Sequence, residues 1–146
     1  MASKTFYKCG EGHKTGLGNP VLQALRDFSE SKPMSNCPVC GSPRGLYRVF
    51  AFGLGAGSPE CKVLDAFLPR DPPSWQEDGK WVTFYPFLVV MEYTGKKAQA
   101  FWLPYWHTVE GTATRETKYG QWAPFMDEPL FKDLLAQARE RGYLGG

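Results

Sequence analysis

Two pairs of potential metal ligands constrain the fold of this chain more than any other feature of its sequence. Cys9 and His13 form a C-x3-H pair in YKCGEGH. Cys37 and Cys40 form a C-x2-C pair in NCPVCGS, which allows two thiolates to reach one ion from a tight turn. Gly41 follows at once and lets backbone amides point at the sulfurs. Three thiolates and one imidazole suit tetrahedral zinc, so the sequence predicts one closed, structural Zn²⁺ site.

The same residues allow two other interpretations. The cysteines could be unligated reduced thiols beside a surface histidine. The C-x2-C pair could instead be a redox motif, which is expected to open a helix in a thioredoxin-like setting. The residues GSPRG after Cys40 do not continue as a helix, so zinc is the preferred interpretation.

Residues 5–48 resemble the zinc ribbon class. CPVCGS is similar to the second knuckle of a zinc ribbon, and YKCGEGH is similar to a first knuckle in which His13 replaces the second cysteine. The chain departs from that class in its C-x3-H spacing and in a helix inserted between the knuckles. Asn19 and Pro20 are suited to start that helix, and its expected apolar stripe is Val21, Leu22, Leu25 and Phe28. The resemblance implies a structural zinc ion and favours a nucleic-acid partner.

The pattern of the remaining chain predicts an α+β fold of two parts. Residues 1–48 are expected to form the zinc ribbon-like module, packed on a small antiparallel, possibly barrel-like sheet with a C-terminal helix in residues 49–146. The expected elements are a strand at 46–52, a short helix at 59–68, a loop at 69–79, strands within 80–94 and 95–109 joined by a turn at YTGKK, an irregular segment at 110–126 and a helix from Asp127. The stripe of the last helix is Leu130, Phe131, Leu134, Leu135 and Ala138, with Arg139, Arg141 and Gly142 at its end.

Composition indicates a globular chain, which we expect to be cytoplasmic. Hydrophobic residues make up 42% and charged residues 22% of the 146 positions. No apolar run is long enough to span a membrane, and MASKTFYK lacks the apolar core of a signal peptide. We therefore expect no membrane partner.

The distribution of charge favours a polyanion as partner of the first part. The net charge is only +2, but residues 1–48 hold seven Lys or Arg against three acids. Ordinary variation on a solvated surface explains this excess equally well. The residues expected to bind nucleic acid are Lys8, Lys14, Arg44 and Arg48 for phosphates, Trp102, Trp106 and Trp122 for stacking on bases, and Arg115 and Lys118 beside them.

A second kind of chemistry is conceivable around Cys61. If residues 59–68 form a helix, Cys61 lies in its first turn, where the helix dipole lowers the pKa of a thiol. The loop GLGAGS before it could present amides to an anion, and His107 and Asp65 could act as base and orienting group. The preferred interpretation is a buried structural thiol, because cysteine is among the residues most often buried.

These observations support three classes of function. The first is a zinc-stabilised nucleic-acid-binding protein, working as an accessory subunit of a larger complex. The second is a protein-interaction adaptor whose zinc site is purely structural. The third is an enzyme that uses the loop before Cys61 or an aromatic cleft near His107, although we find no paired acids and no recognisable hydrolase motif.

Overall fold

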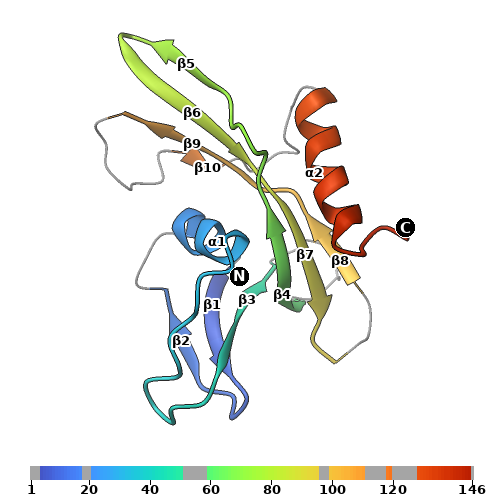
Figure 1. The fold of residues 1–146 in the computed structure, drawn as a ribbon. Coiled ribbons are helices and arrows are strands. Elements are labelled where there is room, and N and C mark those ends of the chain that lie inside the picture. Colours follow the sequence, from blue (N-terminus) through green and yellow to red (C-terminus); the bar gives the residue numbers. More distant parts are fainter. Residues whose placement is uncertain are drawn as a thin grey trace. The chain divides into compact units, whose positions relative to one another are not determined.

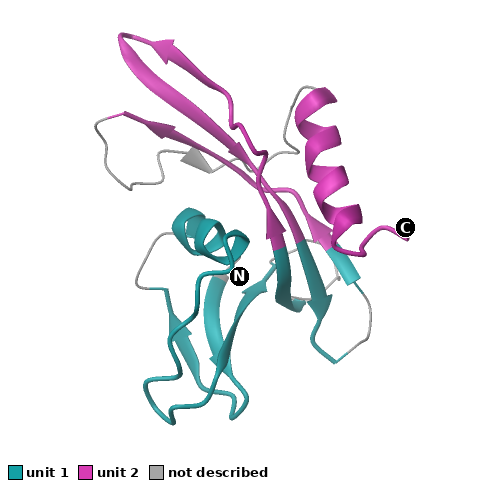
Figure 2. Ribbon diagram, viewed as in Figure 1, with its two compact units in different colours: residues 1–65, 90–100 teal, residues 66–89, 101–146 magenta. Residues whose placement is uncertain are grey.

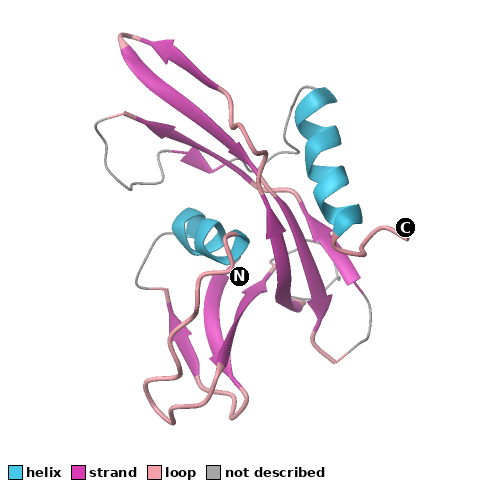
Figure 3. Cartoon of the chain, in the orientation of Figure 1, coloured by secondary structure: helices cyan, strands magenta, loops and turns pink. Residues whose placement is uncertain are grey.

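A computed structural model describes residues 4–17, 21–50, 59–95, 99–110, 118–119 and 128–145 of this chain. This described part is α+β, with strands in the majority and a helix near the C-terminus (Figures 1 and 3). The helices are α1 (Val21–Ser29) and α2 (Glu128–Glu140). The strands are β1 (Lys4–Cys9), β2 (Lys14–Gly16), β3 (Arg44–Val49), β4 (Glu60–Phe67), β5 (Ser74–Glu77), β6 (Lys80–Pro86), β7 (Leu88–Tyr93), β8 (Gln99–Trp102), β9 (Tyr105–Val109) and β10 (Lys118–Tyr119).

The strands form two sheets. One has six strands in the order β2-β1-β3-β4-β7-β8, and the other has four in the order β10-β9-β6-β5. The pairs β1–β2, β1–β3 and β3–β4 are antiparallel, as are β5–β6, β6–β9 and β9–β10. The mostly antiparallel α+β class expected from the sequence is therefore confirmed.

The chain divides into two compact units (Figure 2). Unit 1 holds residues 1–65 and 90–100, and unit 2 holds residues 66–89 and 101–146. The boundary expected after residue 48 falls inside β3, which pairs with β4. Unit 1 therefore includes more of the chain than the residues 1–48 expected from the sequence to form one module.

Helix α1 supplies much of the core of unit 1. Leu22, Ala24 and Leu25 are buried, as is Leu46 on β3. Burying each of the three leucines stabilises the fold by about 1.5–3 kcal/mol. The apolar stripe expected from the sequence is present, although Val21 and Phe28 are only half-buried.

Helix α1 is followed by a residue with a left-handed backbone conformation that is not glycine. Ser31 has a φ of 56°. Its amide donates to the carbonyl of Phe28 at 3.0 Å, and the amide of Lys32 donates to the carbonyl of Asp27 at 3.0 Å. This pair of bonds is the Schellman arrangement, in which glycine is the residue usually found at the left-handed position.

The prediction of a helix at 59–68 is wrong, since Glu60–Phe67 forms strand β4. Cys61 and Val63 are buried and Lys62 between them is exposed, which is the two-residue period of a strand. Pairing of β4 with β3 outweighs the helical spacing of Val63, Leu64, Phe67 and Leu68. The expectation that Cys61 lies in the first turn of a helix is therefore also wrong, because Cys61 lies on strand β4.

The loop expected at 69–79 contains an additional strand. Ser74–Glu77 forms β5, whose last residue pairs with Lys80 of β6. The two residues between them, Asp78 and Gly79, have φ values of 51° and 77°. Positive φ at both central residues is typical of a type I′ hairpin turn, for which Asp-Gly is a preferred sequence.

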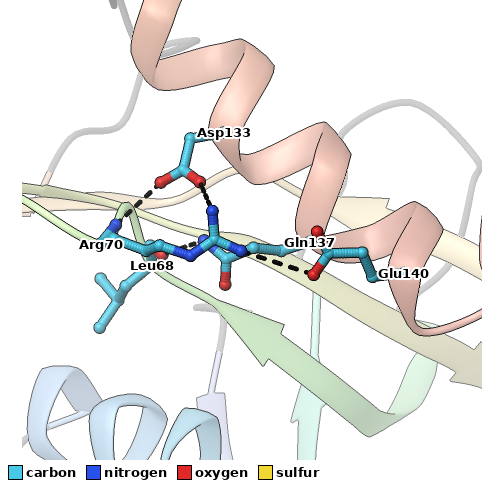
Figure 4. Close-up of polar contacts among 5 residues, drawn as sticks. All are labelled: Leu68, Arg70, Asp133, Gln137 and Glu140. Carbon is cyan, nitrogen blue, oxygen red and sulfur yellow. Dashed lines mark hydrogen bonds and ion pairs between the residues drawn. The ribbon is translucent and has the colours of Figure 1, made fainter.

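Helix α2 is anchored to the segment after β4 by polar contacts within unit 2 (Figure 4). The backbone amide and Nη1 of Arg70 donate to the two carboxylate oxygens of Asp133 at 2.8 and 3.0 Å. Nη2 of Arg70 lies 3.4 Å from Glu140 Oε2, and Nε2 of Gln137 donates to the carbonyl of Leu68 at 2.7 Å. These bonds fix the face of the helix that meets residues 68–70.

The C-terminal helix was predicted well except on one side of its stripe. Leu134 and Ala138 are buried, but Phe131 is 40% exposed. The amides of Gly142 and Tyr143 donate to the carbonyls of Arg139 and Ala138, so the helix stops where the sequence indicates. The cap expected at Asp127 lies outside the described residues. No described helix is long and apolar enough to cross a membrane.

Candidate metal centre

The first pair of candidate ligands lies in the turn between β1 and β2. Cys9 is the last residue of β1, and His13 directly precedes β2. The amide of Gly12 donates to the carbonyl of Cys9 at 3.0 Å, and the amide of Cys9 donates to the carbonyl of His13 at 3.2 Å. This tight turn brings the thiol and the imidazole to the same side of the hairpin end.

The second pair lies in the turn before β3. The amide of Gly41 donates to the carbonyl of Cys37 at 2.8 Å, and the amide of Cys37 donates to the carbonyl of Ser42 at 2.8 Å. Gly41 has a φ of 73°, a conformation that L side chains rarely adopt. A glycine after the C-x2-C pair is therefore required by the backbone of this turn.

The four predicted ligands converge on one point. Cys9 Sγ lies 3.4 Å from His13 Nδ1 and 3.7 Å from Cys40 Sγ, and Cys37 Sγ lies 3.9 Å from His13 Nδ1. All four ligand atoms lie within 4.8 Å of one another. Bonds of roughly 2.0–2.3 Å to a tetrahedral ion place neighbouring ligand atoms about 3.5–3.8 Å apart. The arrangement therefore fits one tetrahedral metal ion.

The surroundings favour the thiolate form of two of the cysteines. A hydrogen bond with the hydroxyl of Ser42, at 3.3 Å, is the largest of the effects that lower the pKa of Cys40 to about 6. The backbone amide of Cys40 lowers the pKa of Cys37. Burial raises the pKa of Cys9. A cation at the centre would offset the cost of burying that third thiolate.

This cluster is suited to hold the fold together and leaves little room for chemistry. Cys9 and Cys37 are 4% and 3% exposed, and four protein ligands leave no position for water or substrate. Its ligands join the β1–β2 hairpin to the start of β3. No other group of three or more potential ligands is found among the described residues.

The cations predicted to bind phosphate around the cluster have partners within unit 1. Lys8 forms an ion pair with Glu60, and Lys14 Nζ lies 3.2 Å from the other carboxylate oxygen of Glu60. Lys14 is 57% exposed at its side chain, whereas Lys8 is 19% exposed. The two lysines therefore share the single negative charge of Glu60, which offsets one of their two positive charges.

Arg44 and Arg48 differ in their access to a ligand. Arg44 is half-buried, with its guanidinium 4.2 Å from the ring centroid of Tyr7 and hydrogen-bonded to Ser35. Arg48 is 7% exposed and donates to Thr5 Oγ1 at 2.7 Å. Arg48 is thus a core residue, and its burial opposes a contact with phosphate.

The aromatic residues predicted to stack on bases are only partly accessible. Trp106 is 1% exposed and packs edge-to-face against Phe87 at 5.6 Å, so its ring has no free face for a base. Trp102 is half-buried against Trp106. Arg115 and Trp122 lie outside the described residues, and Lys118 is described only by its pairing with His107.

The structure also bears on the thiol chemistry considered for Cys61. Cys61 is 2% exposed on β4, and burial raises the pKa of its thiol, which opposes formation of a nucleophilic thiolate. His107 lies in unit 2 among aromatic rings, stacked on Phe84 at 5.2 Å and edge-on to Trp75 at 5.8 Å. The burial of Cys61 expected from the sequence is confirmed. The loop GLGAGS lies outside the described residues.

A cleft beside the metal centre was missed by sequence reasoning. It has a volume of about 490 Å³. It is lined by Lys8, Cys9, Gly10, Phe28, Met34, Pro43, Arg44, Gly45, Tyr47, Lys62, Val63 and Leu64. Reading residues 60–67 as a strand would have placed Lys62 on the face opposite Cys61 and Val63, and therefore toward solvent.

Comparison with protein-family models, with curated proteins and with solved structures returns no match. The zinc ribbon resemblance therefore rests on the two knuckle motifs and on their convergence in unit 1.

Proposed function

We propose that this protein is a zinc-stabilised nucleic-acid-binding protein that works as an accessory subunit of a larger complex. Zinc is the ion proposed because three thiolates and one imidazole in tetrahedral arrangement match its preferred ligands and geometry. The ion would hold the ends of β1 and β3 together and so support the surface beside them.

The observation that carries the nucleic-acid proposal is the charge of the cleft beside the metal centre. Lys8, Arg44 and Lys62 line it, and none of the described residues that line it is acidic. Aromatic rings are present with the cations, because Tyr47 and Phe28 line the same cleft. Cations that track a phosphate backbone and rings that stack on bases are the two components of single-strand binding.

The competing proposal is a protein-interaction adaptor, and one observation favours it. Val39 lies between Cys37 and Cys40 at the tip of the second knuckle and is 70% exposed. An apolar side chain held outward by a rigid turn is suited to contact a protein partner. A single residue is a small surface, so this proposal takes second place.

Salt dependence distinguishes the two proposals. Binding of a fluorescent 12-nucleotide single strand, DNA or RNA, is measured by anisotropy between 50 and 200 mM salt. Two phosphate contacts, at Arg44 and Lys62, predict a loss of affinity of about sevenfold over this range, from a slope of roughly −0.7 per phosphate. Absence of binding to any single strand at 50 mM salt would contradict the nucleic-acid proposal and favour the protein-interaction adaptor.

A further inference from the structure

The cleft beside the metal centre opens where β3 and β4 separate. The register between these strands runs from Val49–Glu60 to Tyr47–Lys62. Farther along, Gly45 of β3 pairs with Lys8 of β1, while Gly45 and Leu64 of β4 both line the cleft. The opening is therefore a fork between two strands of one sheet. Backbone pairing with β1 holds β3 in place on one side of the fork.

Three cations line the cleft, and they differ in their availability to an anion. Arg44 is held in place, because its Nε and Nη2 donate to the carbonyl and hydroxyl of Ser35 at 2.8 and 2.6 Å. Lys62 is exposed, and no acid pairs with it in the part of the chain that the structure describes. Lys8 is neutralised by Glu60, which does not line the cleft. Arg44 and Lys62 are thus the cations available to an anionic ligand in the fork, which they approach from opposite faces of the sheet.

One wall of the cleft offers an aromatic surface. Tyr47 is half-buried and its ring lies nearly parallel to that of Phe6, at 6.2 Å and 12°. Lys8 Nζ lies 4.5 Å from the centroid of the Tyr47 ring. The glycine at position 45 leaves room for the side chains of Lys62 and Tyr47, which frame this wall. A Cβ there would come within 3.2 Å of both Lys62 Cε and Tyr47 Cε1.

We propose that this cleft binds one nucleoside monophosphate unit, with its phosphate at Arg44 and Lys62 and its base against Tyr47. The volume of about 490 Å³ lies within the range of roughly 300–1,000 Å³ that small ligands occupy. This inference rests on the proposed nucleic-acid binding and adds the size and chemistry of the ligand. The unit is either a free nucleotide or an unpaired nucleotide of a strand, since both present the same groups.

The test is calorimetric titration of the purified full chain with adenosine and uridine monophosphates. Adenosine and inorganic phosphate serve as the two halves of the ligand, and each is expected to bind at least about tenfold more weakly than the nucleotide. Lys62→Ala is expected to weaken nucleotide binding about tenfold, because it removes a charged contact. Lys80→Ala removes an exposed lysine of β6 in unit 2 and is expected to leave binding unchanged.

A second variant tests the aromatic wall. Gly45→Val places a side chain between Lys62 and Tyr47 and is expected to abolish nucleotide binding. Because this substitution could disturb β3, metal content and circular dichroism are compared with those of the parent. Lys62→Ala alters only an exposed side chain, so it keeps the proposal testable if the valine variant fails to fold.

The outcomes separate this inference from the proposed function. Nucleotide binding that survives Lys62→Ala, or inorganic phosphate that binds as tightly as the nucleotide, would overturn the assignment of the cleft. A 12-nucleotide strand that binds while neither monophosphate does would overturn the cleft but support the proposed function. Monophosphates that bind and are lost in Lys62→Ala, while no strand binds, would support the cleft and overturn the proposed function.

Discussion

Cys9 Sγ and Cys40 Sγ lie 3.7 Å apart although 31 positions separate them in the sequence. The register of β1 and β3 explains this approach, because Cys9 pairs with Arg44 just after the second knuckle. Three thiols, two of them buried, and an imidazole gathered at one point gain little from one another without a cation. Folding of unit 1 and binding of a metal ion should therefore be one coupled process.

Replacing one ligand should remove the metal and much of the stability. Structural zinc contributes roughly 10–16 kcal/mol in zinc-finger peptides, so we expect Cys37→Ser to lose at least about 3 kcal/mol of unfolding free energy. Metal content and chemical denaturation measure the two effects. Cys61→Ala is the matched control, because this buried cysteine lies outside the cluster and should keep the full metal content. A Cys37→Ser variant that unfolds like the parent would contradict a structural role.

The metal ligands could be predicted from the sequence because their spacing is a local property. C-x2-C followed by glycine encodes its own turn, and Gly41 indeed has the left-handed backbone that the turn needs. The C-terminal helix was predictable for a similar reason, since its stop is a sequence-local cap. Both signals are contained in a few adjacent residues, so they do not depend on contacts with the rest of the chain.

The errors concern features that depend on distant residues. Residues 60–67 carry both a helical and an alternating pattern, and pairing with β3 decides between them. Glu60 pairs with Lys8 and Lys14 only because β4 lies in the same sheet as β1 and β3. The cleft is likewise created by the fork of two strands. Only the Asp-Gly turn before β6 was a local signal that we overlooked.

The left-handed serine after α1 predicts a stabilising substitution. Ser31 adopts a φ of 56°, which costs an L residue free energy that glycine avoids. We expect Ser31→Gly to raise the unfolding free energy by about 0.5–1 kcal/mol. Chemical denaturation at neutral pH measures the change. Ser35→Gly is a control for the added flexibility of glycine and should not stabilise, since it removes the hydroxyl that binds Arg44.

Glu60 should make unit 1 sensitive to acid. Burial raises the pKa of Glu60, but hydrogen bonds from Lys8 and Lys14 outweigh it and hold the pKa below the ordinary value of 4.5. The unfolded chain therefore takes up the proton first as the pH falls. The stabilisation from Glu60 should be complete above about pH 4.5 and be lost as the pH falls through the lower folded-state pKa.

The variant Glu60→Gln tests that linkage. We expect it to be about 1–2 kcal/mol less stable than the parent at pH 7, because two charged contacts are lost. The difference should shrink as the pH falls below about 4.5, and denaturation curves from pH 3 to 7 measure it. Glu77→Gln on exposed strand β5 should follow the parent throughout. A difference that is constant over this pH range would contradict the linkage.

The contacts of Arg70 predict the strength with which α2 is anchored within unit 2. Asp133 accepts two hydrogen bonds from Arg70 and is 21% exposed. We expect Asp133→Ala to cost about 1–2 kcal/mol of unfolding free energy. Glu128→Ala removes an exposed i,i+4 partner of Lys132 and should cost less than about 0.5 kcal/mol. Equal effects of the two variants would show that the Arg70 contacts do not anchor the helix.

The most direct test of the central claim is the metal content of the freshly purified chain, measured without added metal or chelator. The convergence of Cys9, His13, Cys37 and Cys40 predicts one tightly held zinc ion per chain, and removal of that ion by a strong chelator should unfold unit 1. Less than about half an equivalent of metal in a folded protein would contradict the claim.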